Sequence, residues 1–79
     1  MRPQVEEIGL PNVFMGKTLS ALDLRRHPQA LILAIKTRDG WIYNTPRDYV
    51  IAEKDTLVYI STPEGKDELE KSLLSAKPA

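Results

Sequence analysis

Residues 31–65 read LILAIKTRDGWIYNTPRDYVIAEKDTLVYISTPEG and contain three predicted strands. The first two, 31–36 and 41–44, flank a turn that holds Asp39-Gly40, and the second of them is rich in aromatic and β-branched side chains. This dipeptide supplies the positive φ angles of a tight hairpin turn. The third strand is predicted at 56–61, after a connection whose proline cannot donate to a ladder. The stretch therefore predicts an antiparallel sheet.

The strand at 31–35 carries an apolar side chain at every position. Successive side chains of a strand point to opposite faces, so both faces of this strand are apolar. A strand at the surface of a small monomer normally has one polar face. A chain of 79 residues has little material for a second covering layer. We therefore expect a partner molecule to cover one face of this strand.

The segment before the hairpin predicts one strand and one short helix. Residues 5–10 alternate weakly and form the first strand. Thr18 is a plausible N-cap for a helix that places Leu19 and Leu22 on one face. Pro28 ends this helix, because the residue before a proline avoids the α region.

The segment after the hairpin predicts the C-terminal helix. Thr62 is its N-cap and Pro63 takes the first helical position, but Gly65 is unfavourable in a first turn. We therefore expect the helix to begin near Lys66 or Asp67. The resulting order is β-α-β-β-β-α, an α+β domain with a four-stranded, mostly antiparallel sheet and two helices, which we expect to be dimeric.

The composition excludes several classes of protein. Eleven Lys and Arg balance eleven Asp and Glu, whereas duplex nucleic acid binders are strongly basic. The chain has no cysteine and one histidine, so no thiolate or multi-histidine metal site forms within it. The sequence contains neither a nucleophile elbow nor a glycine-rich phosphate-binding loop. We therefore expect no catalytic residues and no metal site, and hence not an enzyme.

The sequence also bears on location and domain organisation. No apolar run approaches the roughly 20 residues of a membrane-spanning helix, and the first residues lack the apolar core of a signal peptide. We expect one soluble domain over residues 1–79, excised from a longer protein, with a flexible tail at 76–79.

Trp41 and Tyr43 allow two interpretations. They are either a stacking platform for nucleic acid bases or a packed pair on the predicted hairpin. The adjacent Asp39-Gly40 turn and the zero net charge favour packing, so we expect no nucleic acid partner.

Residues 16–25, GKTLSALDLR, resemble the start of the TrkA-C domain, the C-terminal lobe of RCK modules (regulators of potassium conductance). Other motifs of that family are similar to residues 32–36, 39–40, 44–46, 48–51, 54–60 and 62–64. The resemblance extends from Val5 to Leu73 and implies the same β-α-β-β-β-α fold.

The resemblance implies a cytosolic, ligand-sensing regulatory domain of a potassium channel or potassium transporter, which controls gating. It implies a homodimer whose parent protein also carries an N-terminal RCK lobe and a membrane pore or transporter, with no direct membrane insertion by this domain. Two alternatives remain open: a purely structural dimerisation module without a ligand, and a regulatory domain of another cation antiporter.

One branch of the family binds cyclic di-adenosine monophosphate at the dimer interface, which implies this nucleotide or another small anionic ligand. The corresponding positions in this sequence are Leu19, Asp23, Arg25, Leu31, Ile32 and Pro46. The resemblance implies that Arg25 pairs with a phosphate and that Pro46 flanks a base. Leu31 stands where that branch favours asparagine.

Overall fold

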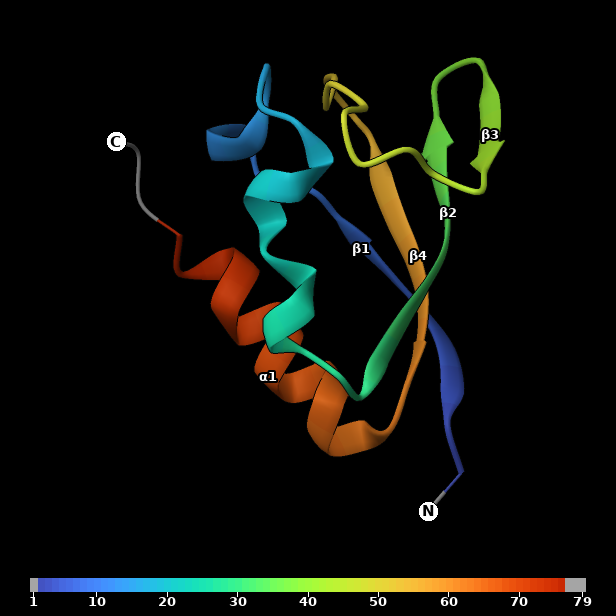
Figure 1. Ribbon diagram of the computed structural model, residues 1–79, viewed down its shortest axis with the longest axis vertical. Helices are drawn as coiled ribbons and strands as arrows, with labels where there is room; N and C mark the ends of the chain where they lie inside the picture. Colours follow the sequence, from blue (N-terminus) through green and yellow to red (C-terminus); the bar gives the residue numbers. More distant parts are fainter. Residues whose placement is uncertain (1, 77–79) are drawn as a thin grey trace.

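The computed structural model describes residues 2–76, without the side chain of Arg25. It contains one four-stranded sheet with the strand order β1-β4-β2-β3, in which every pairing is antiparallel (Figure 1). The strands are β1 (Gln4–Gly9), β2 (Ala30–Thr37), β3 (Gly40–Tyr43) and β4 (Thr56–Ser61). The α+β class and the four-stranded sheet predicted from the sequence are confirmed.

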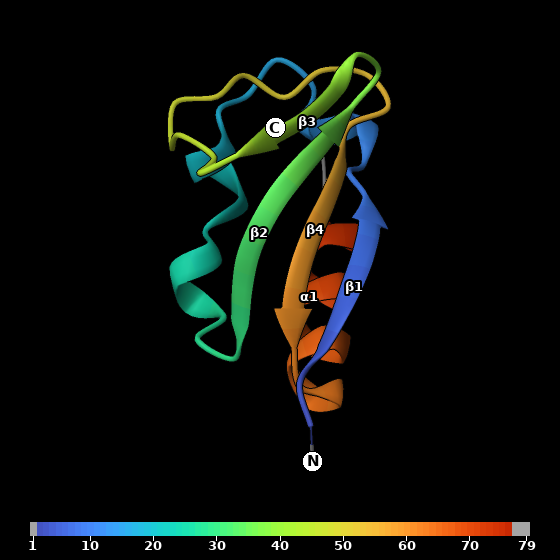
Figure 2. The ribbon, with the colours of Figure 1, turned by 90° about the vertical axis from the view of Figure 1, so that its right-hand side faces the viewer.

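All helical segments lie on one side of this sheet (Figure 1). They are the α-helix α1 (Pro63–Leu74) and the 3-10 helices η1 (Asn12–Phe14), η2 (Leu19–Leu22) and η3 (Leu24–Arg26). Figure 2 looks onto the opposite side, where α1 lies behind β1 and β4 and no helix stands in front of the strands. The described part of the chain therefore forms two layers, and within it one face of the sheet is bare.

The strand register separates the covered face from the bare face. Ile8 of β1, Leu57 of β4 and Ile35 of β2 are paired across the sheet, so their side chains share the face that meets α1. All three are buried, and Leu69 and Leu73 of α1 complete this part of the core. Burial of one such aliphatic side chain contributes about 1.5–3 kcal/mol, so this row accounts for much of the stability of the domain.

The bare face, which we call the outer face, carries apolar side chains that no other segment of residues 2–76 covers. Leu31 is 64 % exposed and is paired with Ile60, which in turn is paired with Val5. Leu33, also exposed, is the extra residue of an irregularity in the β2–β4 register, between Ile32 and Ala34. The expected apolar second face of β2 is therefore present and open to solvent.

The helix predicted after Thr18 is not an α-helix. The segment forms the two 3-10 helices η2 and η3 instead. Asp23 separates them because its backbone is left-handed, with φ 52° and ψ 49°. Asp tolerates this conformation, which ends a regular helix. The Asp23 N–H donates to the carbonyl of Ser20 at 3.1 Å, the three-residue spacing of a 3-10 turn.

The expected late start of the C-terminal helix is wrong, because α1 begins at Pro63. Thr62 is the N-cap, as predicted, and its hydroxyl accepts a hydrogen bond from the Gly65 N–H at 3.1 Å. A Cβ at Gly65 would lie 2.8 Å from Cβ of Gln29 and would also collide with the side chain of Ser61. Glycine therefore stands in this first turn because the neighbouring segments approach it closely.

The predicted tail at 76–79 begins at a residue that packs against the core, Ala76. The remainder of that tail, residues 77–79, lies outside the described residues. Within residues 2–76, no helix has the length and apolarity needed to cross a membrane.

Candidate functional site

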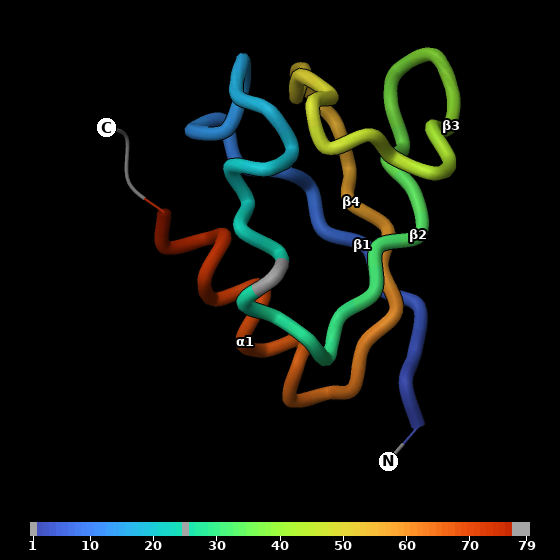
Figure 3. The backbone as a smooth tube through the Cα atoms, in the orientation of Figure 1, coloured from blue at the N-terminus to red at the C-terminus, as the bar shows by residue number. Residues whose placement is uncertain are grey.

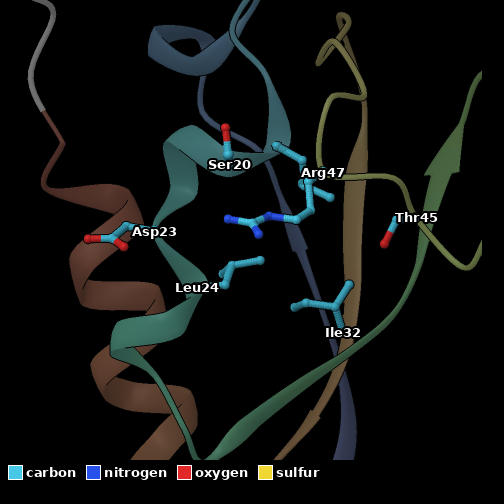
Figure 4. A pocket seen from close by; sticks show the side chains of 7 residues that line it. Ser20, Asp23, Leu24, Ile32, Thr45 and Arg47 are labelled. Carbon is cyan, nitrogen blue, oxygen red and sulfur yellow. The ribbon is translucent and has the colours of Figure 1, made fainter.

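A pocket of about 300 Å³ opens between η2, η3, β2 and the connection that follows β3 (Figure 4). Its lining consists of Leu19, Ser20, Asp23, Leu24, Ile32, Thr45 and Arg47. These residues come from three separate stretches of the sequence, which the sheet and its irregular covering layer bring together. The volume is at the lower end of the range for small-molecule sites, about 300–1,000 Å³.

Two walls of the pocket are fixed to each other by backbone hydrogen bonds. The residues of η2 and the connection between β3 and β4 run side by side (Figure 3). The bonds are Leu19 N–H to Tyr49 O (2.8 Å), Ser20 N–H to Arg47 O (3.1 Å), Ile51 N–H to Lys17 O (2.8 Å) and Gly16 N–H to Ile51 O (2.9 Å). Backbone bonds of this kind do not depend on side-chain identity, so the backbone frame of the pocket stays in place when its lining side chains are changed.

The pocket combines an apolar floor with a polar rim. Leu19 is buried, and Leu24 and Ile32 are half-buried, so together they provide an apolar surface. Ser20 and Thr45 contribute hydroxyl groups at the rim. Such a lining suits a ligand with an apolar or planar body and a few hydrogen-bonding groups.

The rim also carries charge of both signs, but the two charges do not pair. Figure 4 shows the guanidinium of Arg47 extending into the pocket, whereas the carboxylate of Asp23 points away from it. Asp23 instead forms an exposed ion pair with Arg26, in which Oδ2 of Asp23 lies 3.8 Å from Nη1 of Arg26. Exposed pairs of this type contribute about 0–1 kcal/mol, so they do not constrain the site.

The structure brings together part of the set of residues expected at the site. Leu19, Asp23 and Ile32 line the pocket, and Pro46 stands between two lining residues. Leu31 belongs to the outer face, since its strand neighbour Ile32 points to the other side of the sheet. The side chain of Arg25 lies outside what the structure describes.

Sequence reasoning missed four lining residues, namely Ser20, Leu24, Thr45 and Arg47. Each is adjacent in sequence to a residue that was expected at the site. In a 3-10 turn, residues three apart lie in one line, so Ser20 and Asp23 reach the same pocket, which a search by α-helical spacing does not reveal.

The aromatic pair on β3 is a packed pair, in agreement with the favoured interpretation. The rings of Trp41 and Tyr43 are stacked, with centroids 6.1 Å apart and planes 6° from parallel. Lys36 lies above the Trp41 ring, with Nζ 5.6 Å from the centroid. These contacts stabilise the β2–β3 hairpin on the outer face, away from the pocket.

The architecture, an open antiparallel sheet with helical segments on one face, defines an α+β domain. A family model of the TrkA-C domain matches residues 6–74, and the chain belongs to this family. The resemblance found in residues 16–25 is thereby confirmed. A search of curated proteins gave no match.

Several solved structures share this fold. The GsuK RCK domain is 25% identical over 94% of this chain, with a TM-score of 0.77, and the match covers 17% of that chain. The RCK C domain of the potassium transport protein KtrA, in complex with cyclic di-adenosine monophosphate, is 22% identical over 87% of this chain and 81% of its own, with a TM-score of 0.77. The RCK_C dimer of S. agalactiae BusR, with the same nucleotide, is 18% identical over 89% of each chain, with a TM-score of 0.72. This chain therefore spans less than a fifth of the GsuK chain.

Proposed function

We propose that this chain is a cytosolic regulatory domain of a potassium channel or transporter, which senses a small ligand as a homodimer and thereby controls gating. The observation that carries the proposal is the pocket, in which Leu19, Asp23 and Ile32 lie together. These are three of the positions that the family resemblance implies for a cyclic dinucleotide. Membership of the TrkA-C family and the KtrA and BusR complexes support the same reading.

The second copy covers the part of β2 that this chain leaves open. Among the described residues, β3 pairs with β2 from Ala34 to Thr37, so residues 30–33 have a strand neighbour on the β4 side alone. An unpaired strand edge is a template for another strand. Leu31 and Leu33 add exposed apolar side chains to this stretch. A twofold axis beside residues 30–33 would cover both copies of the edge at once.

This arrangement also explains how a small pocket serves a dinucleotide. One pocket of about 300 Å³ is of a size for one half of such a ligand rather than the whole. Ile32 belongs both to the pocket and to the open edge of β2, so a twofold axis at that edge places two pockets close together. A symmetric dinucleotide would then occupy both halves.

Control of gating follows from differential affinity. A ligand shifts an equilibrium between two arrangements only if it binds one of them more tightly. A ligand shared by two copies binds the associated arrangement more tightly than the separated one. The remaining parts of the parent protein would respond to that change in association.

Two measurements on the 79-residue chain test the proposal. Sedimentation at micromolar concentration is expected to show a dimer, and a well-folded monomer would contradict the association. Calorimetry with cyclic di-adenosine monophosphate is expected to show saturable binding of one nucleotide per two chains. A dimer that binds neither this nucleotide nor any other metabolite in a thermal-shift screen would favour a purely structural dimerisation module.

A further inference from the structure

We propose that Arg47 pairs with the anionic group of the pocket's ligand, in addition to the pairing that the family resemblance implies for Arg25. The ligand class is a small organic anion, such as a phosphate ester, whose apolar or planar body rests on Leu24 and Ile32. This inference rests on the ligand-sensing role proposed above and adds to it a second charge-pairing residue, which lies outside the motif of residues 16–25.

The direction of the Arg47 side chain is the first observation. In Figure 4 it crosses the pocket from the connection after β3, and its guanidinium lies between Ser20 and Leu24. Thr45 lines the same pocket, whereas the Ser20 hydroxyl is hydrogen-bonded to the hydroxyl of Thr18 at 2.7 Å and points away from the guanidinium (Figure 4). A guanidinium fork above an apolar floor is suited to one anionic group.

The charge of Arg47 is available, which is the second observation. Among the described residues, the ion pairs join Arg26 to Asp23 and Lys66 to Glu6, and neither involves Arg47. Asp23 lines the pocket, but its carboxylate points away from the pocket and from the guanidinium (Figure 4). Arg47 is exposed to solvent, so its free charge is hydrated and costs no desolvation while the pocket is empty of ligand.

The backbone that carries Arg47 is held in place, which is the third observation. Its carbonyl accepts the Ser20 N–H at 3.1 Å, and the Tyr49 N–H donates to the Pro46 carbonyl at 3.1 Å in the same turn. The root of the side chain is therefore fixed relative to η2. A positioned guanidinium binds phosphate or carboxylate through two parallel hydrogen bonds, which a lysine cannot reproduce.

The test compares Arg47→Gln and Arg47→Lys with the unchanged chain in calorimetric titrations. The probes are cyclic di-adenosine monophosphate, AMP and adenosine, which share a base and differ in charge. Loss of a charge-assisted contact is expected to weaken binding of the two phosphate-bearing probes by roughly tenfold to a hundredfold in Arg47→Gln. Arg47→Lys is expected to lose less affinity for these two probes. The affinity for adenosine is expected to be equal in all three chains.

A matched control removes a positive charge elsewhere. Arg38→Gln changes an exposed arginine in the β2–β3 turn, which does not line this pocket. It is expected to bind every probe as the unchanged chain does. Binding in the unchanged chain is expected to weaken as salt rises, and this dependence is expected to be shallower in Arg47→Gln. Arg47→Lys, which keeps the positive charge and a long side chain, keeps the test valid if Arg47→Gln folds poorly.

The outcomes separate the two proposals. Equal affinity of Arg47→Gln and the unchanged chain for the phosphate-bearing probes would overturn the role of Arg47 and leave the ligand-sensing function standing. If Arg47→Gln lost as much affinity for adenosine as for the phosphate-bearing probes, the role of Arg47 would also be overturned. Such a loss indicates a structural defect, which does not discriminate by ligand charge. If the unchanged chain binds none of the three probes, both the role of Arg47 and the ligand-sensing part of the proposed function are overturned.

Discussion

The phenol of Tyr49 donates a 2.5 Å hydrogen bond to Oδ2 of Asp55, which is buried at 1 % exposure. The same oxygen accepts the Ala52 N–H at 2.9 Å. The carbonyl of Asp55 accepts the N–H of Leu10, just beyond β1, at 2.9 Å. The carboxylate of Asp55 therefore closes the turn before β4, and its backbone carbonyl ties that turn to the end of β1.

Tyr49→Phe removes one of the two hydrogen bonds to this buried oxygen. We expect the free energy of unfolding to fall by about 1–3 kcal/mol, the cost of leaving a buried acceptor less satisfied. Urea denaturation followed by circular dichroism measures the change. Tyr43→Phe is the matched control, because Tyr43 is 67 % exposed, and its effect is expected to stay within about 0.5 kcal/mol. Equal effects of the two substitutions would contradict this account.

The same contact makes the stability of the domain sensitive to alkaline pH. Burial and the hydrogen bond to Asp55 raise the pKa of Tyr49 from 10.0 to about 12. Below pH 10 both the folded and the unfolded state keep the proton, so the full stability is present. Between pH 10 and 12 the unfolded state loses it first, so stability is expected to fall as pH rises.

Urea midpoints measured across that alkaline range test this expectation. Burial also raises the pKa of Tyr59, whose phenol donates to Glu70 at 2.6 Å, so part of the decline comes from this second tyrosine. Tyr49→Phe is therefore expected to reduce the slope without abolishing it. A slope that is the same in Tyr49→Phe would show that Tyr49 does not contribute.

Gly65→Ala is expected to destabilise the domain by about 1–3 kcal/mol, because the new methyl group overpacks the contact with Gln29 and Ser61. Gly9→Ala is the control: no atom lies within 4 Å of a Cβ built there. Thermal unfolding of the two variants compares them directly. A neutral Gly65→Ala would mean that α1 moves away from Gln29 at little cost.

Leu31→Lys is expected to convert the proposed dimer to a monomer without unfolding it, because a charge then stands at the covered edge of β2. Leu74→Lys is the matched control, since Leu74 is similarly exposed, at 67 % against 64 %, but belongs to α1. Sedimentation measures the association state, and circular dichroism measures the fold. Dissociation by Leu74→Lys but not by Leu31→Lys would place the interface on α1.

Strong local signals made most of the fold predictable. Strand β4 (Thr56–Ser61) was predicted with its observed bounds, because its side chains alternate between two apolar faces. The Thr62 cap and Pro63 fixed the beginning of α1, whereas Gly65 misled the prediction. The reason is tertiary, since only the folded chain brings Gln29 beside that turn. The left-handed backbone of Asp23 is likewise not visible in helix periodicity.

The site was less predictable than the fold. Leu19, Asp23 and Ile32 were expected through family positions, and the structure places them around one pocket. Arg47 was not expected, because its place depends on how the connection after β3 lies against η2. No local pattern in the sequence contains that long-range pairing.

The alternation of β2 has a mechanical consequence. Ile32 lines the pocket, while Leu31 stands on the outer face, and the two are joined by a single planar peptide unit. That unit is rigid, so a rotation of the strand about its own axis displaces both side chains together and in opposite senses. Ligand binding in the pocket would thus be coupled to subunit contact on the outer face through one peptide unit, whose two Cα atoms are about 3.8 Å apart, with no intervening side chains.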